Sequence, residues 1–258
     1  MLGPNTGVAI GVWKDFDAKP PFDTGTFHYT VIREGAWRVS YIHESFLPAP
    51  QAVSTLVPPH NTDGVGGADG WEPLFDGRTL DGWFGTFVGQ ELRRSWRVED
   101  GCLVSVADGP RSSLITARQY LFFDLRFEWS AGPKANSGVK YRLLGFDRIL
   151  NDSREALGFE YQIADDQGDP GARIDPKQRS GALYSVTAVE RSSAKPLGQW
   201  NESRIVVTAD RVEHWLNGLV TARTATDLPF ASSIVLQHHT TEVRFRNVRI
   251  RLLRDSFQ

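Results

Sequence analysis

Phe123-Asp124-Leu125-Arg126-Phe127-Glu128-Trp129 is the stretch that decides the fold class of this chain. Its apolar residues stand at the odd positions and its charged residues at the even positions. Successive side chains of a β-strand point to opposite faces of a sheet. The alternation therefore predicts a strand with one face on a hydrophobic core and the other face in water.

Similar short runs, rich in Val, Ile, Phe, Trp and Thr, recur on both sides of this strand with turn residues between them. The clearest runs lie at 96–98, 102–106, 113–116, 204–208, 212–216, 219–224, 233–239 and 243–253. Asn217-Gly218, between two of these runs, is a strong hairpin signal. We find no convincing helix longer than a turn or two. The pattern predicts an all-β fold, either a β-sandwich or a jelly roll.

The last of these runs contains a change of phase. Its inward-facing residues shift from odd positions, Val243 and Phe245, to even positions, Val248 and Ile250. A shift of this kind predicts a β-bulge near Arg246-Asn247. Bulges re-aim side chains and are common beside active sites.

The chain is predicted to divide into an N-terminal hairpin extension (1–47), a Pro/Gly-rich linker (48–70) and a main domain (71–258). Residues 26–46 contain two apolar runs around a turn at Gly35, and they resemble the closing strands of a SnoaL-like or nuclear-transport-factor-2-like domain. A lone hairpin is only marginally stable in water. We therefore expect this segment to dock on the main domain or on a second copy of the chain, as in a homodimer.

Bulk composition excludes several classes of partner. The net charge is -2, the pI is near 6.3, and no basic run or aromatic-basic module is present, which argues against nucleic acid or another polyanion. No apolar stretch approaches the ~20 residues of a membrane span. The N-terminus lacks the basic start and apolar block of a secretory signal. We expect a soluble protein of the bacterial cytoplasm or periplasm.

Gly158-Phe-Glu-Tyr-Gln-Ile-Ala-Asp165 is a strand with unusual polar content. Alternation places Glu160 and Gln162 on one face, while the aromatic and aliphatic residues take the other. Asp165 follows at the strand's exit. This polar face is either simply solvated, as in many antiparallel sheets, or it holds a polar ligand.

Two long connections flank this strand, Gly145 to Ala156 and Asp166 to Ser180. Loops of this length inside a compact domain are commonly functional lids or binding loops. We therefore expect the second connection, which is rich in Asp, Gly and Pro, to act as a lid.

Ten motifs of the chain resemble, in the same order, those of the 3-keto-disaccharide hydrolase family. They are Trp71–Trp83, Trp96–Leu103, Phe123–Trp129, Ala135–Arg142, Gly158–Asp165, Gly181–Tyr184, Gly198–Asn201, Leu216–Gly218, Ile234–His239 and Phe245–Ile250. The resemblance implies a concanavalin-A-like jelly roll, a β-sandwich whose concave face and rim loops hold a sugar.

The resemblance also implies activity on glycosides that carry a ketone at C3. Such a ketone acidifies the C2 proton, so a carboxylate or an imidazole can remove it, and an oriented donor can hold the enolate oxygen. The C1 substituent then leaves, and water adds to the unsaturated product. This hydrolase or lyase route needs no cofactor and takes a small carbohydrate as substrate. The alternative is a non-catalytic carbohydrate-binding module on the same fold.

Four catalytic residues follow from the resemblance. Glu160 and Asp165 are the candidates for acid/base work, with their individual roles left open. His239 corresponds to the family's histidine after the Leu-Gln pair, and Arg142 to its arginine after Asn-Ser-Gly, as an electrophile.

Six further residues are implied as substrate-binding groups: Gln162, Lys140, Asn136, Tyr184, Gln237 and His238. Alternation puts Lys140 on the face of Arg142 and Gln237 on the face of His239, while His238 competes with His239. Asn136 begins an Asn-Ser-Gly sequence that is typical of a turn. Tyr184 either stacks on a sugar or finishes a strand.

A metal site is left open by the sequence. Glu160 and the aspartates at 165, 166, 169 and 175 offer hard oxygen ligands suited to calcium or magnesium. No spacing among them matches a defined ion-binding loop.

Overall fold

The computed structural model describes residues 6–14, 24–34, 36–45, 70–85, 92–149, 153–168, 174–226, 231–239 and 241–253. In this part of the chain nearly all regular structure is β. Only two short 3₁₀ helices occur among these residues, η2 (Leu92–Arg94) and η3 (Pro176–Gln178). The predicted all-β class is confirmed. The chain divides into two compact units.

The first unit contains a three-stranded antiparallel sheet of order β1-β2-β3. Its strands are β1 (Thr6–Lys14), β2 (Thr24–Glu34) and β3 (Ala36–Ser45). β2 and β3 are the two strands of the hairpin predicted around Gly35, and β1 is an addition that the sequence did not reveal. The predicted linker lies outside the described residues except for Gly70. The domain boundaries, the resemblance to a SnoaL-like domain and the homodimer remain predictions.

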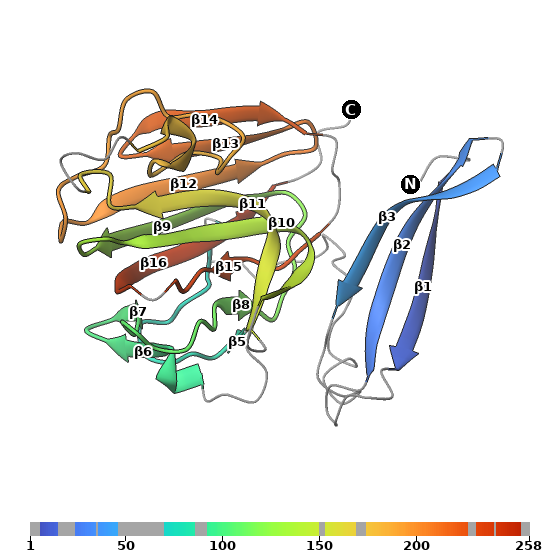
Figure 1. Ribbon diagram of the computed structural model, residues 1–258, viewed down its shortest axis with the longest axis horizontal. Coiled ribbons are helices and arrows are strands. Elements are labelled where there is room, and N and C mark those ends of the chain that lie inside the picture. Colours follow the sequence, from blue (N-terminus) through green and yellow to red (C-terminus); the bar gives the residue numbers. More distant parts are fainter. Residues whose placement is uncertain are drawn as a thin grey trace. The chain divides into compact units, whose positions relative to one another are not determined.

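The second unit is a sandwich of two sheets, which we call front and back (Figure 1). The front sheet has the order β11-β10-β15-β8-β5, and the back sheet has the order β14-β13-β12-β9-β16-β7-β6, with β4 paired to β16. The front strands are β5 (Trp83–Gly85), β8 (Leu114–Thr116), β10 (Asn136–Ile149), β11 (Ser153–Ala164) and β15 (Val235–Leu236). The back strands are β4 (Glu72–Pro73), β6 (Trp96–Glu99), β7 (Cys102–Ser105), β9 (Phe123–Ala131), β12 (Asn201–Val207), β13 (Arg211–Leu216), β14 (Leu219–Ala225) and β16 (Val243–Leu252).

The hydrophobic core fills the space between the two sheets. The odd residues of β9, from Phe123 to Trp129, all point into it, as their alternation predicts. The front sheet contributes Leu114, Val139, Tyr141, Tyr161, Ile163 and Leu236, and the other back strands contribute Ile205, Val207, Phe245 and Ile250. The outer faces of both sheets are thereby left for polar side chains.

The bulge predicted in the last strand is present. The register of β16 against β9 shifts between Arg246 and Arg249, and Asn247 takes a positive φ of 52°. Asparagine tolerates this left-handed conformation better than most residues do. Without the bulge, an odd-numbered and an even-numbered residue of one strand would point to opposite faces. The shift keeps both Phe245 and Ile250 on the core side.

Two predicted boundaries are wrong. The supposed long connection from Gly145 to Ala156 is mostly strand, because β10 runs to Ile149 and β11 begins at Ser153. Conversely, the run 233–239 forms only the two-residue strand Val235–Leu236. Glycine, aspartate and asparagine have a weak β-propensity, but pairing with a neighbouring strand overrides it. Composition alone therefore places the ends of β10 and β11 too early and too late.

Candidate active site

The outer face of the front sheet carries a row of three polar side chains across neighbouring strands. Gln162 Nε2 on β11 donates a hydrogen bond to Asn136 Oδ1 on β10 at 3.1 Å. Asn136 Nδ2 lies 3.5 Å from His239 Nδ1, a weak contact. The register of β10 with β15, in which Val139 faces Leu236, sets Asn136 opposite His239. The row therefore brings together three residues that are far apart in the sequence.

A second row, centred on Gly138, runs beside the first. Glu160 lies directly over Gly138, and its Oε2 is 3.4 Å from Lys140 Nζ, with both side chains nearly buried. Gln237 faces Gly138 from the far side, where its backbone N–H donates to the Gly138 carbonyl at 2.9 Å. The shared face of Gln237 and His239 remains a prediction. Asn136 and Gly138 belong to strand β10, so the turn predicted there is wrong.

Tyr184 borders these rows on the other edge of β11. Its backbone N–H donates to the Glu160 carbonyl at 3.0 Å, and the neighbouring Leu183 forms a bridge with Tyr161. Residues directly opposite in an antiparallel pair point to the same face, so Tyr184 lies on the face of Glu160. Its side chain is 40% exposed, which leaves the ring open to a ligand.

A hollow of about 560 Å³ adjoins the first row. It is lined by Pro133, Lys134, Ala135, Asn136, Gln162, Ala164, Asp165, Gly168, Ile174, Gln178 and Tyr184. This volume falls within the range of small-molecule sites, and amide, carboxylate and phenol groups converge on it. Gly168, Ile174 and Gln178 come from the predicted lid segment, so that segment forms part of the wall.

Asp165 lies in the wall of this hollow as a loop anchor. Its Oδ2 accepts the backbone N–H of Lys134 at 2.8 Å, and its Oδ1 accepts those of Gln167 and Gly168 at 3.1 and 2.9 Å. Both carboxylate oxygens thus hold the backbone at the exit of β11. The geometry favours a positioning role for Asp165.

Arg142 is not brought to this site. Its backbone has a φ of +50°, which breaks the alternation of β10, and its side chain is 1% exposed. The guanidinium donates to the Thr208 carbonyl at 3.0 Å and lies 6.0 Å from the Phe122 ring centre. Burial lowers its pKa to about 10. The predicted face shared with Lys140 is wrong, because the left-handed backbone at Arg142 turns its side chain toward Thr208 and Phe122.

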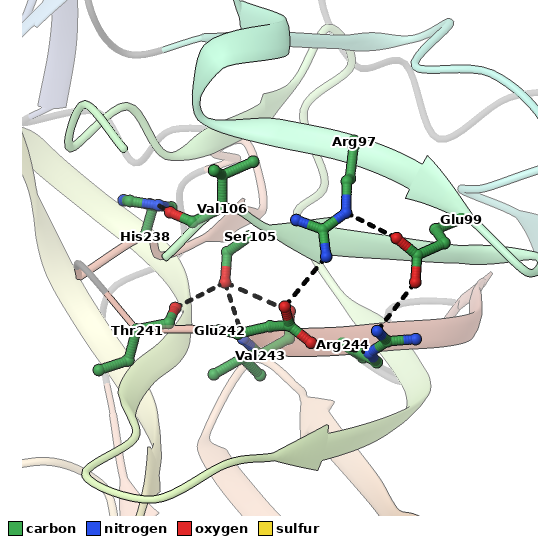
Figure 2. A network of polar contacts seen from close by, with 9 residues as sticks. All are labelled: Arg97, Glu99, Ser105, Val106, His238, Thr241, Glu242, Val243 and Arg244. Carbon is green, nitrogen blue, oxygen red and sulfur yellow. Dashed lines mark hydrogen bonds and ion pairs between the residues drawn. The ribbon is translucent and has the colours of Figure 1, made fainter. Parts of the chain in front are cut away.

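His238 also points away from the site. Its Nε2 donates to the Val106 carbonyl at 2.8 Å (Figure 2). Its ring packs edge-on against Trp96. It is 2% exposed, and burial lowers its pKa. Because His238 is one residue from His239, it takes the opposite face of the sheet. Of the two histidines, only His239 lies beside Asn136, so His239 stays the candidate.

His214 on β13 is a buried polar residue that the sequence analysis overlooked. Its Nδ1 lies 3.2 Å from the carbonyls of Gly181 and Ala182 and must carry the proton, because carbonyls only accept. Its Nε2 then accepts from Tyr141 Oη at 2.7 Å. The signal was available, because His214 falls between Val212 and Leu216 on the inward face of its strand.

This network predicts acid-sensitive stability. Burial lowers the pKa of His214 from 6.5 to about 4, against the opposing effect of its carbonyl partners. The unfolded chain takes up a proton near pH 6.5, so this stability is complete above that pH and is lost as the pH falls toward 4. The loss amounts to roughly 3 kcal/mol in the free energy of unfolding. Urea unfolding between pH 7.5 and 4 measures it.

The matched variant for this measurement is His214→Gln, which keeps a donor and an acceptor but does not titrate. We expect its free energy of unfolding to fall less steeply with acid than that of the wild type, by about the same 3 kcal/mol. Parallel pH curves for the two proteins would contradict the assignment. His238 titrates in both proteins and cancels from the difference.

A metal-binding cluster and a membrane-spanning helix are both absent from the described part of the chain. No three His, Cys, Asp or Glu side chains gather there to hold a metal ion, so the calcium or magnesium site stays an untested prediction. Within the same residues, no helix is long and apolar enough to cross a membrane.

Comparisons with known proteins agree with this architecture. Residues 70–251 match the model of the 3-keto-alpha-glucoside-1,2-lyase-like domain. A Bacteroides thetaiotaomicron protein named 3-keto-disaccharide hydrolase is 28% identical over 231 residues, which cover 72% of this chain and 79% of that protein.

Two crystal structures of provisionally assigned glycosyl hydrolases from Parabacteroides distasonis share the fold. The first has a TM-score of 0.60 and 26% identity, covering 72% of this chain and 95% of the other. The second has a TM-score of 0.57 and 24% identity, and covers 71% of this chain and 99% of the other. At this identity it supports the fold alone.

Proposed function

This chain belongs to the 3-keto-alpha-glucoside-1,2-lyase-like domain family, and from that premise we propose that it cleaves the glycosidic bond of sugars oxidised at C3. The observation that carries the proposal is the pair of polar rows on the front sheet beside a hollow of about 560 Å³. A binding module would need mainly aromatic and amide groups there, whereas these rows also hold a carboxylate, an ammonium and an imidazole.

The reaction begins at the C2 proton, which the C3 ketone makes acidic. A base takes this proton, and the electron pair of the C–H bond forms an enolate with C3 and its oxygen. The enolate then collapses to a C1–C2 double bond while the C1–O bond breaks. An acid protonates the departing oxygen. Addition of water across the double bond would complete a hydrolysis.

Glu160 is our candidate base, because Asp165 is committed to three backbone N–H groups. Lys140, 3.4 Å from Glu160, supplies the positive charge for the enolate oxygen that Arg142 was expected to supply. His239 is the candidate acid, placed two strands away from Glu160.

The remaining polar groups of the two rows are assigned to substrate binding. Gln162, Asn136 and Gln237 offer amides to sugar hydroxyls, and the exposed Tyr184 ring offers a stacking surface. Neither a cofactor nor a metal ion takes part in this scheme.

The proposal is tested by incubating the protein with 3-keto-trehalose and with unoxidised trehalose. We expect loss of the keto-sugar absorbance at alkaline pH only with the oxidised substrate, because trehalose has no acidic C2 proton. Mass spectrometry of the product distinguishes a lyase, which releases an unsaturated sugar, from a hydrolase, which releases a product heavier by one water. Binding by calorimetry without turnover would instead indicate a carbohydrate-binding module.

A further inference from the structure

The outer face of the back sheet carries three arginines in a line across three adjacent strands. Arg204 on β12 is directly opposite Arg126 on β9, which is directly opposite Arg249 on β16. Like charges placed opposite each other in an antiparallel pair are destabilising. We call these three residues the arginine row. Because the arginine row lowers the stability of the sheet, its presence needs an explanation, such as neutralisation by carboxylates or a function in binding.

Neighbouring carboxylates do not neutralise the arginine row. Asp124 is fully buried beneath the row and receives Arg204 at 2.8 and 2.9 Å, Arg251 at 3.3 Å and Arg126 at 3.6 Å. Within the described residues Arg249 forms no ion pair with a carboxylate. Three guanidinium groups therefore share one carboxylate. Arg249 instead attracts Glu128, a carboxylate that already pairs with Arg246. A positive excess thus faces the solvent.

Another part of the same face shows the opposite arrangement. Arg97, Glu99, Arg244 and Glu242 form a closed ring of four ion pairs at 2.7 to 3.0 Å (Figure 2). Two cations there meet two anions. The excess at the arginine row is therefore local to β12, β9 and β16, and a net charge of -2 conceals it.

Two half-buried tryptophans lie against the row. Trp215 has the guanidinium of Arg204 5.5 Å from its ring centre. Trp71 has those of Arg126, Arg249 and Arg251 at 4.8, 5.4 and 4.8 Å. The rings hold the guanidinium groups extended along the sheet by cation–π attraction. The row is thus a fixed surface.

We propose that the arginine row binds an acidic glycan, a sugar chain that carries carboxylate or sulfate groups. Guanidinium groups match these oxyanions with paired N–H donors. Adjacent strands lie ~4.8 Å apart, so the row spans about 10 Å, the length of a few sugar units. The site goes beyond the proposed function, because it lies on the other sheet and faces away from Glu160.

The test is calorimetric titration with hexagalacturonate, with neutral cellohexaose as the ligand control. We compare the wild type with Arg126→Gln/Arg249→Gln and with Arg97→Gln/Arg244→Gln. Both variants remove two positive charges from the same face, and both leave Arg204 and Arg251 on Asp124. We expect the first variant to bind the acidic glycan about tenfold or more weakly, and the second to stay within about twofold of the wild type.

The proposal would be overturned by no binding of hexagalacturonate at low salt, by equal weakening in both variants, or by tighter binding of a single-stranded oligonucleotide with the same number of charges. Inorganic sulfate serves as a competitor. If it displaces the hexamer at millimolar concentration, the row recognises a simple anion and not a glycan. Turnover of 3-keto-trehalose should be equal in the wild type and both variants, which separates this test from that of the front-sheet site.

Discussion

Replacing Glu160 by glutamine is expected to lower kcat for a 3-keto-glucoside by about 10²- to 10⁴-fold, the usual contribution of a positioned general base. Glutamine keeps the shape of the side chain over Gly138 but cannot accept the C2 proton. It also removes the ion pair with Lys140 at 3.4 Å. Initial rates at saturating substrate, together with thermal unfolding, measure both consequences.

A matched control is Glu202→Gln, the same substitution at an exposed position on back-sheet strand β12. It should leave kcat unchanged. Breaking a buried ion pair is destabilising by about 3–5 kcal/mol, so the unfolding curve of Glu160→Gln must show that the protein is folded at the assay temperature. Should it unfold there, both proteins are assayed at a lower temperature at which the variant stays folded. Turnover within threefold of the wild type in a folded variant would remove Glu160 from the mechanism.

The sequence predicted those features that depend on strict alternation. The β9 run placed Phe123 to Trp129 on the core, and the phase change in β16 located the bulge at Asn247. The same rule correctly placed Glu160 and Gln162 on the face opposite Tyr161 and Ile163, because β11 stays extended there. Period-two arguments succeed wherever the backbone keeps its pleat.

They fail where a single residue leaves the extended conformation. Arg142 takes a φ of +50°, and nothing in its neighbours announces that change, so its predicted alignment with Lys140 was lost. The role of Asp165 was equally hidden. Its partners are backbone N–H groups of Lys134, Gln167 and Gly168, and backbone groups carry no sequence signature. Composition shows how many carboxylates a segment contains. It does not show which of them already accept hydrogen bonds from the backbone.

Charge illustrates the same limit. A net charge of -2 argued against any polyanionic ligand. The arginine row arises only after β12, β9 and β16 are paired, because its members come from positions 204, 126 and 249. Local charge on a sheet is a property of register, which the sequence alone does not fix.

Gly138→Ala is expected to reduce kcat/KM by about 10²-fold, although it removes none of the proposed catalytic groups. A Cβ at this position would lie 2.8 Å from Glu160 Cγ and 2.9 Å from the Tyr161 carbonyl oxygen, and closer still to Glu160 Oε1. The backbone of β11 at Tyr161 cannot shift without breaking its pairing. The Glu160 carboxylate must therefore move away from the sheet. Overpacking of this kind also costs about 1–3 kcal/mol in the free energy of unfolding.

The control for this variant is Gly132→Ala, since an added Cβ there meets no atom within 4 Å. Activity and stability of that protein should match the wild type. The decisive comparison combines Gly138→Ala with Glu160→Gln. If the alanine acts by displacing the Glu160 carboxylate, it should add almost nothing to the loss already caused by glutamine, because residues that act as a unit are not additive. A full additional 10²-fold loss in the double variant would show that Gly138 serves the site through another group, with Gln237 on the facing segment as the next to test.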